Sequence, residues 1–258
     1  MEFGPRALGG RSILGNPGLE GIADKINEQI KFRERWRPFC PSILDTIANP
    51  SLAAEITLQP VRRYGVDAAI LFSDIVVPVN AIGFNVDVVP GIGPTVDQPF
   101  RDKTDLNRLR VLEPEVDTSY VLATVEILAE ELEVPLIGFA GAPFTIASYL
   151  IEGQPSRNHA RTKSLMYSEP RVWHDLMERL SDIAIASMRS QILAGASAVQ
   201  LFDSWAGALS ADDYSNYVFP HSQRVFSELE DLEVPRAHFG VGTGELLSLM
   251  SDAGADVV

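Results

Sequence analysis

The later part of the chain repeats a pattern in which an amphipathic helix ends at a glycine and a short apolar strand follows. Gly65, Gly195 and Gly254 each stand at such a junction, and glycine adopts the left-handed conformation that ends many helices at little cost. The apolar runs are nearly continuous, which is typical of parallel strands covered on both faces. The expected strands are residues 68–74, 135–141, 197–204 and 235–242.

The segments between these strands have apolar residues at helical spacing. Two apolar stripes carry this prediction: Val121, Leu122, Val125, Leu128 and Leu132, and Met177, Leu180, Ala184, Met188 and Ile192. Helices that alternate with parallel strands predict either a (β/α)8 barrel or an open doubly wound sheet. Polar residues stand where the apolar runs stop, at 73–74 and 203–204. They favour the barrel, whose site lies at the C-terminal ends of the strands. The glycines at 240, 242 and 244 lack the dinucleotide-binding spacing and indicate a tight turn.

Composition narrows the class of protein. The 258 residues carry a net charge of −14, with 46% hydrophobic residues. This balance excludes a disordered chain and argues against nucleic-acid binding, which needs a basic surface. The sequence shows neither a signal peptide nor an apolar run long enough for a membrane helix. Cys40 is the single cysteine, so we expect no internal disulfide and a cytoplasmic location.

Several stretches resemble the uroporphyrinogen decarboxylase family. They are residues 50–78, GIGP at 91–94, IGFAGAPFTIASYLIEG at 137–153, QLFDSWAG at 200–207 and HFGVGTGELL at 238–247. The resemblance covers residues 42–258 and implies an α/β fold, a partial (β/α)8 TIM barrel that lacks its first and last strands. We count about five strands after residue 66, and the sequence ends inside an apparent further strand at Val257–Val258.

Residues 1–41 resemble a different family. GPRALG at 4–9, followed by Arg11-Ser12 and by DKINEQIKFRERWRPFCPS at 24–42, is similar to the C-terminal region of O-carbamoyltransferases. Charge changes at the same place, from +2 over residues 1–41 to −16 over residues 42–258. We therefore expect two domains, 1–41 and 42–258, joined by a fusion or, as we favour, by an assembly or gene-prediction error.

The larger resemblance implies a reaction. Family members convert uroporphyrinogen III to coproporphyrinogen III in porphyrin and heme biosynthesis, removing CO2 from four acetate side chains without metal or organic cofactor. A pyrrole protonated on carbon acts as its own electron sink, a task that otherwise needs a cofactor. The family resemblance also implies a homodimer. The four histidines are widely separated in sequence and show no metal-binding spacing.

The resemblance assigns four site residues. Asp74 corresponds to the aspartate that binds the pyrrole N–H groups, and an ionised carboxylate suits this role because it accepts several hydrogen bonds and stabilises nearby positive charge. Tyr149 and Ser204 correspond to residues that hydrogen-bond substrate carboxylates, and Phe139 to an apolar wall beside the ring. The structural alternatives are a helix cap for Asp74 and Ser204, and core packing for Tyr149 and Phe139.

Two expected parts of the family site are not found in this sequence. One is a first-strand segment similar to RQAGRYLPEY, whose arginines hold substrate carboxylates, and the other is a histidine near the C-terminus. We therefore expect the chain to be inactive alone and marginally stable or insoluble, because an incomplete barrel exposes sheet edges. The alternative functions are a carbamoyltransferase-related fragment and a non-catalytic half-barrel that binds a tetrapyrrole or docks on a partner.

Overall fold

The computed structural model describes residues 2–3, 12–13, 43–89 and 93–258. The first two of these stretches are the strands β1 (Glu2–Phe3) and β2 (Ser12–Ile13), which pair antiparallel. The predicted boundary at residues 41–42 and Cys40 lie outside the described residues.

A parallel sheet occupies the centre of residues 43–258. Its strands, in the spatial order β3-β6-β7-β8, are β3 (Ala69–Ile70), β6 (Leu136–Gly141), β7 (Ala198–Asp203) and β8 (Arg236–Gly240). Each neighbouring pair is parallel. All four lie within the predicted strands, but β3 is much shorter than predicted. A parallel bridge between Ala237 and Val257 adds a fifth position beside β8, where another strand was expected.

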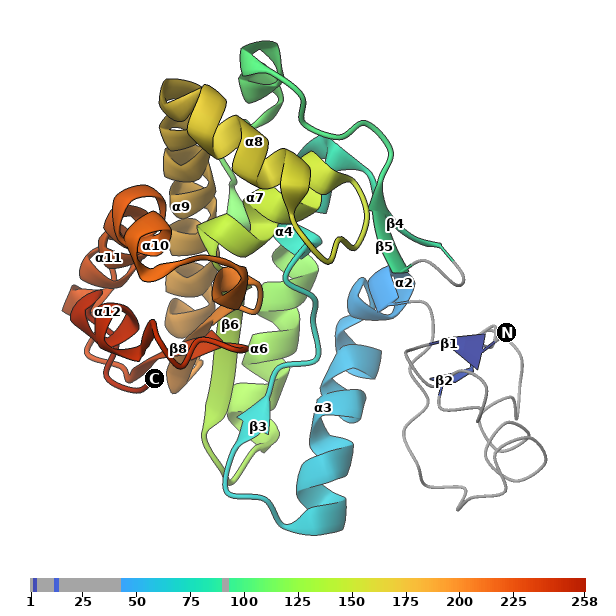
Figure 1. Ribbon diagram of the computed structural model, residues 1–258. Coiled ribbons are helices and arrows are strands. Elements are labelled where there is room, and N and C mark those ends of the chain that lie inside the picture. Colours follow the sequence, from blue (N-terminus) through green and yellow to red (C-terminus); the bar gives the residue numbers. More distant parts are fainter. Residues whose placement is uncertain (1, 4–11, 14–42, 90–92) are drawn as a thin grey trace.

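Helices follow the strands and cover the sheet (Figure 1). The α-helices are α2 (Ile43–Ile47), α3 (Pro50–Tyr64), α4 (Val77–Val79), α5 (Pro114–Asp117), α6 (Ser119–Glu131), α7 (Pro143–Glu152), α8 (Ala160–Ser168), α9 (Pro170–Leu193), α10 (Ala211–Tyr217), α11 (Phe219–Ser227) and α12 (Leu247–Asp252). Shorter helical turns are η3 (Asn80–Phe84), η4 (Lys103–Arg108), η5 (Ala206–Ala208) and η6 (Glu230–Leu232). α3 ends at Gly65, which has the predicted left-handed conformation, with φ 59°.

The two predicted apolar stripes lie on α6 and α9. Val121, Val125 and Leu128 of α6 are buried, as are Met177, Leu180, Ala184 and Met188 of α9. A hairpin that the sequence did not predict, β4 (Val86–Val89) with β5 (Gly93–Val96), extends the link between β3 and α6.

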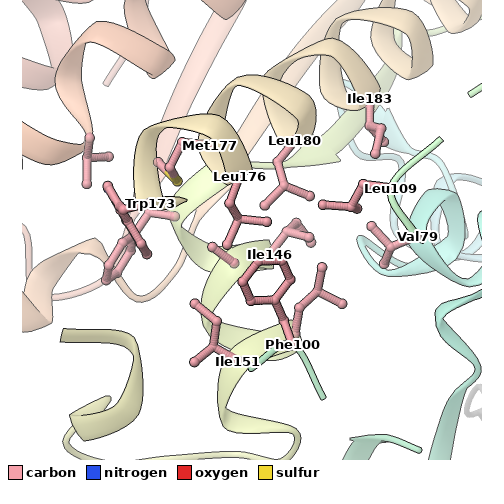
Figure 2. Close-up of a cluster of buried hydrophobic side chains, with 14 of the residues drawn as sticks. Val79, Phe100, Leu109, Ile146, Ile151, Trp173, Leu176, Met177, Leu180 and Ile183 are labelled. Atoms are coloured by element: carbon pink, nitrogen blue, oxygen red, sulfur yellow. The ribbon is translucent and has the colours of Figure 1, made fainter. Parts of the chain in front are cut away.

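The largest buried cluster joins α7, α9 and the segment around η4. Figure 2 shows Ile146, Ile151 and Phe100 close to Leu176 and Leu180 of α9. Trp173 is fully buried in the same cluster, and its indole N–H donates to the carbonyl of Tyr217 at 2.9 Å. This packing fixes α7 against α9 and so fixes where the side chains of α7 point.

The arrangement is part of a (β/α)8 barrel, as predicted. Parallel strands bring their C-terminal ends to one edge, and the segments that follow β3, β6 and β7 meet there. Among the described residues, no helix combines the length and the apolar composition required to cross a bilayer.

Candidate active site at the strand ends

The four residues predicted for the site line one cavity. Asp74, Phe139, Tyr149 and Ser204 all border a space of about 790 Å³ at the ends of β3, β6 and β7. They come from four separate segments, and only the barrel topology places them together. The rest of the lining is mostly apolar and comes from α3, Val66, residues 68–75 and Phe202 of β7.

Asp74 lies in the turn between β3 and α4. Its Oδ1 accepts a hydrogen bond from the Val76 N–H at 3.0 Å, so the carboxylate stabilises its own turn, close to the predicted cap. Burial raises the pKa of Asp74 above its ordinary value, and the hydrogen bond from Val76 opposes this in part. No described residue donates to the second oxygen or forms an ion pair with the carboxylate, which leaves it available to a ligand.

Tyr149 projects from α7 toward the same cavity. Burial, together with the nearby negative charge of Asp74, raises the pKa of Tyr149 to about 12, so the phenol keeps its proton at neutral pH and can donate. Its ring packs on the indole of Trp205, with 4.1 Å between ring centroids, and His159 packs on that indole at 4.9 Å. Tyr149 therefore belongs to an aromatic stack rather than to the core alone.

Ser204 follows β7 directly, and the residues on either side of it are held by buried hydrogen bonds. The next helical turn, η5, begins after Trp205 and has no side-chain cap, so Ser204 is not a helix cap. The Thr145 hydroxyl donates to Asp203 Oδ1 at 2.9 Å and accepts from the Trp205 N–H at 3.3 Å. Asp203 is fully buried, and its other oxygen lies 3.8 Å from His238 Nε2.

Phe139 forms the wall of the cavity and also part of the core. It is buried and meets Phe202 edge to face, with centroids 5.2 Å apart and an angle of 85°. Its backbone is held by Gln191 of α9, which accepts from the Phe139 N–H and donates to the Phe139 carbonyl, both at 2.9 Å.

The cavity contains negative charge and hydrogen-bond donors but no cation among the described residues that line it. A second cavity, of about 880 Å³, includes Ile151 on the opposite face of α7 and contains none of the predicted site residues. Its cations are Arg101, Lys103 and Arg161.

The histidines lie away from this cavity. His174 Nδ1 and His221 Nε2 are 2.9 Å apart between α9 and α11, a contact that the sequence spacing did not indicate. Within the described ranges, no three His, Cys, Asp or Glu side chains are grouped so as to hold a metal ion.

The sequence did not predict the buried residues that hold the backbone of the site in place. Thr57, Thr145 and Gln191 are buried and bond to backbone, and Trp205 completes the aromatic stack. Thr145 and Trp205 lie within the quoted motifs and could have been noted there. Thr57 also lies within such a stretch, at 50–78, whereas Gln191 lies in an ordinary helical pattern outside them and gave no local signal.

Comparison with known proteins agrees with this architecture. Residues 35–258 match the family model "Uroporphyrinogen decarboxylase (URO-D)", so the chain belongs to the uroporphyrinogen decarboxylase family. Residues 1–64 match the family model "Carbamoyltransferase C-terminus". Both predicted resemblances are confirmed, and the two matches overlap at residues 35–64, so the boundary at 41–42 remains a prediction.

Individual relatives give the same result. Proteins named uroporphyrinogen decarboxylase from Streptomyces avermitilis and Thermobifida fusca are each 60% identical over 217 residues, which is 84% of this chain. The chain spans 61% and 60% of the lengths of these two relatives. A solved methyltransferase from Methanosarcina mazei superposes with a TM-score of 0.68 at 21% identity, covering 82% of this chain and 62% of that protein, which supports the fold.

Proposed function

We propose that this chain carries the aspartate-bearing part of a uroporphyrinogen decarboxylase site and that Asp74 binds the pyrrole N–H groups of the substrate. The observation that carries the proposal is the convergence of Asp74, Tyr149, Ser204 and Phe139 on one cavity. A carboxylate with one unpartnered oxygen suits several convergent N–H donors, and it stabilises the positive charge that develops on a protonated pyrrole.

The other three residues have distinct tasks in this proposal. The protonated phenol of Tyr149 and the hydroxyl of Ser204 donate to substrate carboxylates. Phe139 supplies an apolar wall, which keeps water from the ring and strengthens electrostatic interactions with Asp74. The reaction is the loss of CO2 from the four acetate side chains of uroporphyrinogen III to give coproporphyrinogen III, with the ring itself as electron sink.

The charge of the cavity limits what this chain does alone. The substrate is a polycarboxylate, and the described lining offers it no Lys or Arg. Positioned charge-assisted contacts account for much of the rate of such a reaction. We therefore propose that the chain by itself binds a tetrapyrrole through Asp74 without releasing CO2, and that the homodimer and the cytoplasmic location of the family apply to it as well.

The experiment combines binding with turnover. Porphyrinogens prepared under reducing, oxygen-free conditions are titrated into the chain while tryptophan fluorescence is followed, and acetate-labelled uroporphyrinogen is incubated with it to collect CO2. We expect binding that Asp74→Asn weakens by roughly 100-fold, since a charge-assisted bond is worth about 1.5–3 kcal/mol. Asp212→Asn is the control, because Asp212 is exposed on α10, outside the cavity lining. Absence of porphyrinogen binding by the unmodified chain, or equal binding by Asp74→Asn, would contradict the proposal.

A further inference from the structure

We propose that Thr57 and Gln191 are positioning residues that hold β3 and β6 apart beyond Ile70 and thereby place Asp74 in the cavity. The effect of this positioning on tetrapyrrole binding rests on the proposed function, whereas the effect on the location of Asp74 does not depend on it. Neither residue needs to touch a substrate for this task.

The hydrogen bonds between β3 and β6 end early. The Ala69 N–H donates to the Pro135 carbonyl and the Leu71 N–H to the Ile137 carbonyl, at 2.9 and 3.1 Å. In a parallel ladder every second residue of a strand bonds to the same neighbour, so Phe139 would bond next to β3. The backbone bonds of Phe139 on that side go to Gln191 instead.

Gln191 takes the place of the missing strand. Its side-chain amide presents an acceptor and a donor in the same plane, like a peptide group, and satisfies the N–H and the carbonyl of Phe139 at 2.9 Å each. Gln191 is 3% exposed. The amide therefore removes the cost of leaving two buried backbone groups of β6 without partners.

Thr57 anchors the segment after β3 on the side that faces away from β6, because the N–H groups of Ala69 and Leu71 face β6 and that of Phe72 points the other way. Its hydroxyl donates to the Ala53 carbonyl at 2.9 Å within α3, and it accepts from the Phe72 N–H at 2.9 Å. Because the hydroxyl proton is engaged with Ala53, a lone pair is left to face Phe72. Phe72 precedes Asp74 by two residues, so this bond determines where the turn carrying the carboxylate begins.

The Gln191 bonds lie on the side of β6 that faces β3, whereas the Thr57 bond ties the segment after β3 to α3 on the side away from β6. Without the Gln191 amide, Phe139 would leave two buried backbone groups unpaired, and the cheapest repair is to continue the β3–β6 ladder through Leu71 and Ser73. Without the Thr57 hydroxyl, the segment after β3 would lose the bond to α3 that opposes this movement. A longer β3 would draw residues 73–75 into the sheet, and Asp74 would leave its present turn. The structure thus assigns the early end of β3 to side chains of α3 and α9 rather than to the strand sequence.

The test uses Thr57→Val and Gln191→Leu, which keep side-chain volume close to the original and remove the bonds to Phe72 and Phe139. Thr57→Ser retains the hydroxyl and serves as the rescue variant. Thr124→Val is the matched control, because Thr124 is also buried in a helix and its hydroxyl donates only within α6, to Tyr120.

Two readouts separate positioning from general destabilisation. The carboxyl carbon of Asp74, assigned by comparison with Asp74→Asn, is titrated by NMR, and affinity for coproporphyrinogen is measured. In Thr57→Val and Gln191→Leu we expect the pKa of Asp74 to fall toward its ordinary value, with affinity weakened roughly tenfold, the effect of one buried polar group left unpaired. Thr57→Ser and Thr124→Val should match the unmodified chain in both readouts.

The inference is overturned if Thr57→Val and Gln191→Leu leave both the titration of Asp74 and the affinity as they are in Thr124→Val. If the unmodified chain binds no porphyrinogen but its Asp74 titration shifts in the two variants, the proposed function fails and the positioning role stands. If affinity falls equally in Thr124→Val, the loss reflects stability and the positioning role is refuted.

Discussion

Gly138→Ala tests the contact between β6 and Gln191 most directly. A Cβ on Gly138 would lie 2.7 Å from Gln191 Oε1 and 3.3 Å from the Cβ atoms of Gln191 and Ala196. The first distance is too short for any real contact, so the amide has to move. Moving it breaks the two hydrogen bonds to Phe139.

The magnitude follows from these contacts. Two buried hydrogen bonds contribute about 1 kcal/mol each, and inserting a methyl group into a packed region costs about 1–3 kcal/mol. Replacing glycine by alanine returns about 0.5–1 kcal/mol, because the unfolded chain loses freedom. We expect Gly138→Ala to lower the free energy of unfolding by about 2–4 kcal/mol.

A double-mutant cycle with Gln191→Ala isolates the cause. With the amide already absent, the two remaining contacts at 3.3 Å are tolerable, so Gly138→Ala should cost less than about 0.5 kcal/mol in that background. The expected coupling is therefore about 2–4 kcal/mol, well above the roughly 0.3–0.5 kcal/mol typical of independent sites.

The assay is urea unfolding followed by circular dichroism, with trimethylamine N-oxide present to raise the stability of every variant. Gly244→Ala is the control, since nothing lies within 4 Å of a Cβ at that position. Additive effects of Gly138→Ala and Gln191→Ala would refute the reasoning, and so would a loss at Gly244→Ala as large as that at Gly138→Ala.

Two further predictions concern pH. Because burial raises the pKa of Asp74, the folded state disfavours the ionised carboxylate and loses stability as the pH rises through that pKa. Asp74→Asn should therefore raise the melting temperature at pH 7, but should leave it unchanged below about pH 4, where the carboxyl is protonated in the unfolded chain as well. Equal shifts of the melting temperature at both pH values would contradict this. Burial, together with electrostatic repulsion from the neighbouring His174 and Arg224 side chains, lowers the pKa of His221 to about 4. The unfolded chain then binds the proton first, so the free energy of unfolding should fall on the order of 1–3 kcal/mol between pH 6.5 and about 4, and His221→Gln should remove most of this slope in urea unfolding.

The sequence predicted the sheet well where hydrogen bonds follow the strand and poorly where they do not. β6, β7 and β8 agree with their apolar runs because ordinary ladders extend along them. Residues 68–74 have the same apolar character, yet β3 ends at Ile70. Beyond Ile70, Leu71 is buried and residues 72–74 are half-buried, while the Phe72 N–H bonds to the Thr57 side chain of α3 and not to a strand. The apolar pattern therefore reports burial and not strand pairing.

The site residues could also be predicted only in part. Family motifs pointed to Asp74, Tyr149, Ser204 and Phe139, and the structure brings these four together. The residues that fix them lie elsewhere in the chain: Gln191 is 52 residues from Phe139. Such long-range contacts depend on how helices pack on the sheet, which hydrophobic periodicity does not specify.

Charge determines which tetrapyrrole this chain should prefer. Residues 42–258 carry a balance of −16, and the cavity lining contains Asp74 without any described cation. Uroporphyrinogen carries four acetate carboxylates that coproporphyrinogen lacks, while both offer the same pyrrole N–H groups to Asp74. The contact with Asp74 is therefore common to both ligands, whereas the repulsion by its charge is larger for uroporphyrinogen.

At about 10 Å in water, one pair of like charges costs about 0.4 kcal/mol before screening by salt, and physiological salt reduces this to a fraction. Four additional carboxylates thus cost on the order of 1 kcal/mol, so coproporphyrinogen should bind roughly fivefold more tightly than uroporphyrinogen. Rising salt should narrow the difference and strengthen binding of uroporphyrinogen, which titrations at low and high ionic strength measure. Tighter binding of uroporphyrinogen at low salt would refute this reasoning, because contacts of the acetate carboxylates with Tyr149, Ser204 or a cation would then outweigh the repulsion by Asp74.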